Sequence, residues 1–267
     1  MRLPRVMLGA VLALLTLTAT GCQLWNALLA RDHLNKGVRA YKAAQYNTAI
    51  DHFKRAMELD PTLLVARLYL ATAYANQYVP GAESEENIKF AEQAIQAFKD
   101  VLERDPNNVN SVAGIASLYF NMKKPDDAKQ WYEKQIALDP KNPEAWYSVG
   151  VIGWTQTYQP RMEAKAKAGL QPEAPIKDAK IREPLCEKSL PIIEEAFQML
   201  NKAIELRSDY DDAMAYLNLM YREKADCESE ANLRAEDLKK ADEWITRTLE
   251  IKKKKAAGET AGGITAQ

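Results

Sequence analysis

Apolar residues recur along most of the chain every three or four positions, which is the period of an amphipathic α-helix. A trio with i, i+4, i+7 spacing appears five times, and this spacing places each trio on one face of a helix. The pattern predicts an all-α protein. The five trios, the last of them degenerate, are Ala49/Phe53/Ala56, Ala94/Phe98/Val101, Ala128/Tyr132/Gln135, Ala196/Leu200/Ala203 and Ala241/Ile245/Thr248.

A second series of small residues precedes these trios and predicts a partner helix for each. Small side chains let two helices cross closely, so each unit is expected to be a helix pair. Three units also share an ending in Asp-Pro, within segments 56–61, 101–106 and 136–140. The small-residue series is Gly37, Ala71, Ala116, Gly150 and, less well matched, Asn218.

Equivalent positions are separated by 34 residues or by 34 plus an insertion. Pro106 and Pro140 are 34 residues apart, and the first residues of the trios follow at steps of 45, 34, 68 and 45. A 34-residue helix pair that ends in proline resembles the tetratricopeptide repeat. The resemblance implies a right-handed α-solenoid of about five helix pairs, with insertions in repeats 2, 4 and 5.

The register predicts how the chain is divided. All three insertions fall between the two helices of a unit, so they should gather along one rim of the solenoid. The largest holds five prolines, and its stretch 162–170 is predicted to form a short helix. Residues 256–267 predict a disordered tail. The expected repeats lie near 30–63, 64–108, 109–142, 143–210 and 211–255, which together form the solenoid 30–255.

The amino terminus has the pattern of an export signal. Two arginines precede the apolar run 6–17, which is too short for the about 20 residues that a helix needs to span a bilayer core. The run ends in Gly21-Cys22, which resembles the bacterial lipoprotein signal. The resemblance implies a signal peptide over 1–21, lipidation of Cys22 and a short tether over 22–29. An ordinary secretory signal and a short anchor helix remain the alternatives.

The same resemblance places the protein in the bacterial cell envelope. Gln23 follows the cysteine, whereas Asp at that position retains lipoproteins in the inner membrane of enteric bacteria. We therefore expect a lipid anchor on the periplasmic side of the outer membrane. This compartment permits disulfides. Cys186 and Cys227 lie in insertions on the same rim, which predicts a disulfide between them, with two free thiols as the alternative.

Composition argues against several classes of function. The chain has 36 Lys and Arg against 37 Asp and Glu, a net charge of −1, and nucleic-acid binding would need a basic surplus. His33 and His52 are the only histidines, and no third metal ligand accompanies them. No glycine-rich phosphate loop or nucleophile elbow occurs in the sequence. We therefore expect no enzyme, no metal and no cofactor.

In tetratricopeptide proteins the first helix of each unit lines a groove that holds a partner. The resemblance implies that aromatic rings and amides line the groove here, where they supply contact area at low entropic cost. About half of them are expected to pack between units instead. The candidate partner-binding residues are Tyr41, Tyr69, Asn76, Phe120, Asn121, Tyr147, Trp154 and Tyr216.

These features favour a non-catalytic, lipid-anchored scaffold that binds a protein or peptide of the cell envelope. The Lys/Asn/Arg clamp with which some family members hold a terminal carboxylate is absent as a set. Its neighbourhood is occupied by Val38, Leu68, Ala113 and Ala215. The alternative is a glycan-binding protein that recognises peptidoglycan or an exported polysaccharide by stacking Tyr and Trp on sugars.

Overall fold

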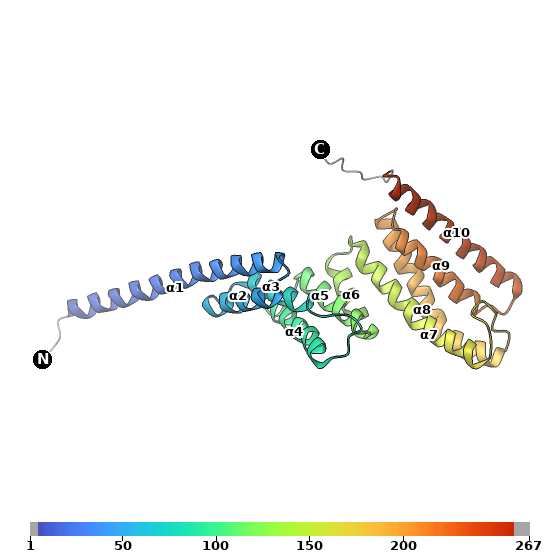
Figure 1. Cartoon of the computed structure of the whole chain (residues 1–267), viewed down its shortest axis with the longest axis horizontal. Helices are drawn as coiled ribbons and strands as arrows, with labels where there is room; N and C mark the ends of the chain where they lie inside the picture. The colour runs from blue at the N-terminus through green and yellow to red at the C-terminus, as the bar shows by residue number, and fades with distance from the viewer. Residues whose placement is uncertain (1–4, 259–267) are drawn as a thin grey trace. The chain divides into compact units, whose positions relative to one another are not determined.

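The computed structural model describes residues 5–258, with side chains from residue 23 onward, and consists of α-helices joined by short loops (Figure 1). The predicted all-α architecture of helix pairs is confirmed. The helices are α1 (Arg5–Lys42), α2 (Tyr46–Leu59), α3 (Leu64–Ala75), α4 (Glu85–Leu102), α5 (Val109–Asn121), α6 (Pro125–Leu138), α7 (Pro143–Lys167), α8 (Ala179–Leu206), α9 (Asp211–Ala225) and α10 (Ala231–Ala256).

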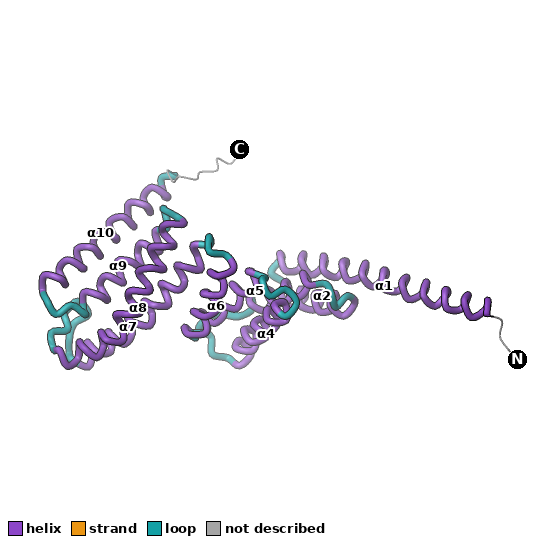
Figure 2. The backbone as a smooth tube through the Cα atoms, turned by 180° about the vertical axis from the view of Figure 1, so that it is seen from behind, coloured by secondary structure: helices purple, strands orange, loops and turns teal. Residues whose placement is uncertain are grey.

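The helices form two compact units, residues 1–122 and 123–267. In the first unit α1 packs against α2 and α3 against α4, while α5 packs on α4. In the second unit α7 packs against α8 and α9 against α10, while α6 packs on α7 (Figure 2). Each unit therefore has its own set of paired helices and its own core.

Capping residues and prolines set many of the helix ends. The side chains of Ser84, Asn108 and Asn142 each accept a hydrogen bond from a backbone N–H in the first turn of the helix that follows. Proline occupies the first position of α6 and of α7, where its missing N–H costs nothing. The Asp-Pro endings lie directly after α2 and α6, because proline cannot continue a helix.

The predicted trios form the buried faces of the second helices. Their leading alanines, among them Ala49, Ala94 and Ala196, are at most 1% exposed. The small residues on the first helices make room for them. A Cβ atom at Gly37 would lie 2.5 Å from the Phe53 ring, and one at Gly150 would lie 2.5 Å from Leu200 Cγ. Two helices therefore approach closely where the sequence keeps one partner small.

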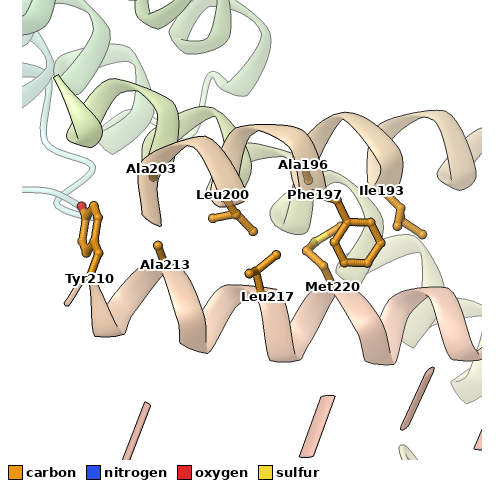
Figure 3. Packing of buried hydrophobic residues seen from close by; sticks show 9 residues of the cluster. All are labelled: Ile193, Ala196, Phe197, Leu200, Ala203, Tyr210, Ala213, Leu217 and Met220. Atoms are coloured by element: carbon orange, nitrogen blue, oxygen red, sulfur yellow. The ribbon is translucent and has the colours of Figure 1, made fainter. Parts of the chain in front are cut away.

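The core of the second unit lies between α8 and α9 (Figure 3). Leu200 of α8 and Leu217 and Met220 of α9 are all fully buried, and their side chains meet between the two helices. Burying a side chain of this size contributes about 1.5–3 kcal/mol relative to leaving it exposed. This packing fixes the register of α9 against α8.

The largest insertion lengthens two helices, and the prediction of a separate short helix over 162–170 was wrong. Helix α7 continues through Pro160 to Lys167, and α8 begins at Ala179 and contains Pro184 and Pro191. Pro160 lies on the exposed side of α7, so the hydrogen bond that the helix loses there can be replaced by water.

A buried group of charges holds the extension of α7 against the end of α9. Asp226 is 4% exposed, accepts a hydrogen bond from Arg161 Nη1 at 2.7 Å and forms an ion pair with Lys165. Lys165 is 1% exposed and also donates to the carbonyl of Pro172 at 2.6 Å. Glu223 pairs with Arg161 at 2.9 Å, although its burial raises the pKa of that carboxyl to about 7. Buried charges persist only when paired in this way.

Cys186 of α8 and Cys227, which follows α9, are joined by a disulfide. Their Cα atoms are 5.4 Å apart, a normal separation for such a bond. The bond links the insertion of the fourth repeat to that of the fifth.

The two ends of the chain differ in how far the structure describes them. Residues 23–29, expected as a tether, are helical and continue α1. The side chains of the predicted signal peptide and of Cys22 lie outside the described residues. Of the tail predicted over 256–267, Ala256 is the last residue of α10, and residues 259–267 lie outside the described residues. Within the described part of the chain, no helix has both the length and the apolarity that a membrane crossing requires.

We predict that Ala128→Asp destabilises the second unit by about 3 kcal/mol or more, because it places an unpaired charge on a fully buried position of α6. Urea unfolding followed by circular dichroism measures the loss. Gln130→Asp adds the same charge two residues away on the exposed side of α6 and should leave the transition nearly unchanged. Equal stability of the two variants would contradict the helix register.

We predict that replacing Cys186 and Cys227 by Ser lowers the free energy of unfolding by up to about 4 kcal/mol, because the bond closes a loop between residues 41 positions apart. A Cys22→Ser background leaves only these two cysteines, so thiol counting on the denatured protein is unambiguous. Reductant should lower the free energy of unfolding of this parent chain and leave that of the double variant unchanged. Two free thiols in oxidised material would show that the bond does not form.

Candidate functional site

A pocket of about 550 Å³ opens in the first unit between α3 and α5, and we call it the α3–α5 pocket. Each is the first helix of a predicted repeat, which is where the sequence predicts the partner-binding residues. Its walls are Val65, Leu68, Tyr69, Thr72, Ala75, Tyr78, Pro80, Phe98, Asn110, Gly114, Ser117, Leu118 and Asn121.

The floor of the pocket depends on a close approach of α5 to α4. A Cβ atom at Gly114 would lie 2.6 Å from the ring of Phe98, so only glycine allows the ring to lie where it does. Phe98 is itself 4% exposed and belongs to a predicted trio. At the mouth Val65 is 41% exposed. The same packing that builds the helix pairs therefore leaves an apolar recess on this face.

The first insertion supplies another wall, and Asn87 fixes it. The Asn87 side chain accepts a hydrogen bond from Val79 N at 2.7 Å and donates to the carbonyls of Val79 and Ala82, both at 2.8 Å. This arrangement holds Tyr78 and Pro80 in the pocket wall. The hydroxyl of Tyr78 also donates to the backbone carbonyl of Asn121 at 3.2 Å. The insertion is thus held by α4 through Asn87 and by the end of α5 through Asn121.

The predicted residues of the first unit are distributed around this pocket. Tyr69 and Asn121 line it. Tyr41 and Tyr69 make a T-shaped contact, with ring centroids 6.1 Å apart, and the Tyr41 hydroxyl accepts a hydrogen bond from Asn76 Nδ2 at 2.9 Å. Tyr41 and Asn76 therefore lie beside the pocket and are not part of its walls. Phe120 is half-buried and does not belong to the walls.

The second unit brings its three predicted aromatic residues together, and with Tyr158 they form what we call the α7–α9 aromatic cluster. Tyr216 of α9 meets Tyr147 and Trp154 of α7 edge-on, at centroid distances of 5.7 and 5.4 Å. Trp154 stacks on Tyr158 at 4.8 Å. All four are half-buried, and the three predicted members pack against the α8–α9 core. They are part core and part surface.

Tyr210 and Glu144 hold Tyr147 in place. The rings of Tyr147 and Tyr210 are 5.0 Å apart, and the hydroxyl of Tyr210 donates a short hydrogen bond to Glu144. Arg207 donates to the same carboxylate at 2.6 Å. Burial acts to raise the pKa of Glu144, but these two hydrogen bonds outweigh it and lower the pKa. The carboxylate therefore stays charged and anchors this side of the cluster.

The cluster offers hydrogen-bond donors but no acid–base chemistry near neutral pH. Burial is the main cause that raises the pKa of Tyr147 well above its ordinary value, and it does the same, to a smaller degree, for Tyr216. Both hydroxyls therefore stay protonated. Trp154 Nε1 is buried and has no hydrogen-bond partner. An arrangement of this kind suits recognition rather than catalysis.

The two histidines lie together but carry few of the features of a metal site. His33 Nδ1 and His52 Nδ1 are 3.1 Å apart between α1 and α2. Burial and the neighbouring His52 lower the pKa of His33. Among the residues that the structure describes, no group of three or more His, Cys, Asp or Glu side chains is arranged to hold a metal ion.

Sequence reasoning missed most of the pocket walls. The sequence marks Leu68 only as a departure from a clamp, and it places Phe98 only in a buried trio. Tyr78 and Pro80 directly follow the point where the first insertion begins, which was the available signal. Tyr158 lies four residues after Trp154, a spacing that places the two on one face of a helix.

Comparison with known sequences supports the repeat assignment. The family model for the tetratricopeptide repeat matches residues 91–150. The human protein O-mannosyl-transferase TMTC3 is 26% identical over 125 residues. That match covers 45% of this chain and 14% of the human protein, so the chain spans only a small part of its length.

Comparison with solved structures shows the same fold. The MamA protein superposes with a TM-score of 0.57 at 18% identity, over 87% of this chain and 97% of that one. YrrB, a TPR protein with an unusual peptide-binding site, superposes with a TM-score of 0.51 at 15% identity, over 83% of this chain and 90% of its own. The matched family model and the helix pairs show that residues 91–150 carry tetratricopeptide-repeat sequence and that the described chain has the fold of such repeats.

Proposed function

We propose that this chain is a non-catalytic scaffold of the bacterial cell envelope that binds a protein or peptide partner and is held at the membrane by a lipid on Cys22. The observation that carries the binding role is the α3–α5 pocket. It is a recess of about 550 Å³ on the helices that bear the predicted partner-binding residues, within the size range of small-ligand sites.

The walls suit one apolar side chain of a peptide together with its backbone. Val65, Leu68 and Phe98 present apolar surface, while the exposed polar residues Asn110 and Ser117 lie at the same pocket. An apolar anchor in a pocket, with amides and hydroxyls beside it for the peptide N–H and C=O groups, is a common mode of peptide recognition. The likeness to YrrB, which has a peptide-binding site, agrees with this reading.

The α7–α9 aromatic cluster is the second contact surface of the proposal. It favours a protein partner over the alternative glycan, because stacking on a sugar needs an open ring face. One face of Trp154 is covered by Tyr158, and Tyr216 makes T-shaped contacts with both Tyr147 and Trp154. The cluster thus presents half-buried rings that already contact one another, together with hydroxyl donors, which fit side chains and amides.

The envelope location is proposed from two features. The amino-terminal pattern that ends in Cys22 resembles a lipoprotein signal. The Cys186–Cys227 disulfide accords with an oxidising compartment, since disulfides are rare in proteins that stay in the cytosol.

We predict that Ser117→Trp fills the α3–α5 pocket and weakens partner binding by more than about tenfold. Ser117 is exposed, so the fold should tolerate the change. Affinity capture from solubilised envelopes identifies the partners, and titration of a captured partner measures the effect. Gln96→Trp adds the same ring to an exposed position of α4 outside the pocket and serves as the control.

The same capture separates the two candidate functions. Specific proteins retained by the control and lost from Ser117→Trp support the scaffold. Retention on peptidoglycan or polysaccharide alone, with no protein partner, would favour the glycan-binding alternative and contradict the proposal.

We predict that Cys22→Ser abolishes incorporation of lipid and leaves an uncleaved or mislocalised precursor, because the lipid is attached through this sulfur. Metabolic labelling with a fatty-acid analogue, followed by gel fluorescence, measures incorporation. Cys227→Ser serves as the control, since it removes a different cysteine and should label as the wild type does. Equal labelling of Cys22→Ser and wild type would rule out the anchor.

A further inference from the structure

The part of α1 that precedes its packing against α2 is helical and carries large apolar side chains on its surface. Leu24 is 69% exposed, Trp25 63% and Leu28 59%. Their spacing of i, i+1 and i+4 places them within one side of the helix. We call these three residues the α1 apolar patch. Figures 1 and 2 show this part of the helix extending beyond α2.

Full burial begins only after the patch. Residues 23–26 are all exposed, whereas Ala30 is fully buried and Gly37 packs closely against the ring of Phe53. A helical segment without tertiary contacts is marginal in water, because most helical stability comes from packing of an apolar face. Exposed apolar side chains gathered on one side of such a segment mark a surface that is covered in the working protein.

The charge pattern points to the chemistry of what covers it. Residues 23–30 contain no charged side chain. Charges begin at the exposed Arg31, followed by Asp32, which pairs with Lys36 at 2.7 Å. An uncharged helical turn with an aromatic ring, followed at once by a cationic residue, is the composition of segments that lie at a membrane–water interface.

We propose that the α1 apolar patch rests on a phospholipid surface, with Leu24, Trp25 and Leu28 inserted at the boundary between headgroups and acyl chains and Arg31 facing the headgroups. At 1.5 Å rise per residue the patch lies within about 9 Å of Cys22 along the helix. A bilayer held at Cys22, or at the upstream apolar run 6–17, is therefore already in reach. The contact is an attachment separate from the proposed lipid.

A second copy of the chain is a weaker candidate for this surface. A stable protein interface buries about 800 Å² on each partner, and it has a packed apolar centre. The patch has three large apolar side chains, and its neighbours Gln23 and Asn26 are polar. Three side chains fall well short of that area. A lipid surface needs no such complementarity.

The test uses the proposed mature chain from residue 22 with Cys22→Ser, so that no lipid is present. Flotation with vesicles of phosphatidylcholine alone, or of phosphatidylcholine and phosphatidylglycerol in equal parts, measures partition. We expect the triple change of Leu24, Trp25 and Leu28 to Ser to weaken partition at least about tenfold. Leu249→Ser removes a leucine of similar exposure, 61%, in α10 and should leave partition unchanged.

Insertion of the ring has its own readout. Brominated lipid should quench part of the tryptophan fluorescence of the parent chain, and Trp25→Phe should remove this quenching while vesicle binding persists. Circular dichroism shows whether each variant is folded. Vesicle binding by the triple variant equal to that of the parent would overturn the proposal. So would a self-association that is lost in the triple variant while neither protein binds vesicles.

The vesicle assay and the lipid-labelling assay test the two proposals independently. A failure of labelling at Cys22 would contradict the proposed lipid anchor but not the proposed membrane contact of the α1 apolar patch, because the vesicle assay uses a chain without lipid. Failure of the unlipidated chain to bind vesicles would contradict the membrane contact of the α1 apolar patch but not the lipid anchor.

Discussion

The whole structure depends on how closely two helices can approach within a pair. At Gly37 and at Gly150 a single methyl group would overlap Phe53 or Leu200, so the absence of a side chain on one helix makes room for a large one on the other. The buried alanines of the second helices extend the same contact along the pair. Dispersion and the removal of apolar surface from water stabilise such a contact only at short range. The pairs, and the units they build, follow from that constraint.

The binding surfaces are a consequence of the same packing. Gly114 brings α5 onto Phe98, and this ring then forms the floor of the α3–α5 pocket. In the second unit the fully buried Leu217 sets the register of α9, which brings Tyr216 against Trp154. Core and site share residues here, so the aromatic cluster is both a structural element and a recognition surface. A substitution that fills a pocket from its exposed side therefore separates binding from stability better than one that removes a wall.

The helices and their pairing could be predicted because they rest on short-range periodicity and on the size of single residues. The presence of the insertions could also be predicted, but their structure could not, because proline predicts a break only where the freed carbonyl has no other partner. Pro160 is exposed, and α7 runs through it to place Lys165 beside Asp226, which is 61 residues further along the chain. Similarly, Tyr78 enters the pocket wall because Asn87 binds the loop backbone. Such contacts depend on three-dimensional neighbours that no local pattern encodes.

The ion pairs of Asp226 and the disulfide of Cys227 involve adjacent residues, and each stabilises the other. Asp226 is buried beside Arg161 and Lys165, a placement that costs desolvation energy and is stable only while all three side chains stay close. The disulfide of Cys227 to α8 prevents the end of α9 from moving away from that group. In turn, the ion pairs hold Cys227 where its sulfur can reach Cys186. The long insertion is therefore attached to the repeat core by a bond and by charges that support one another, and the lengthened α7 carries Trp154 and Tyr158 as a fixed surface.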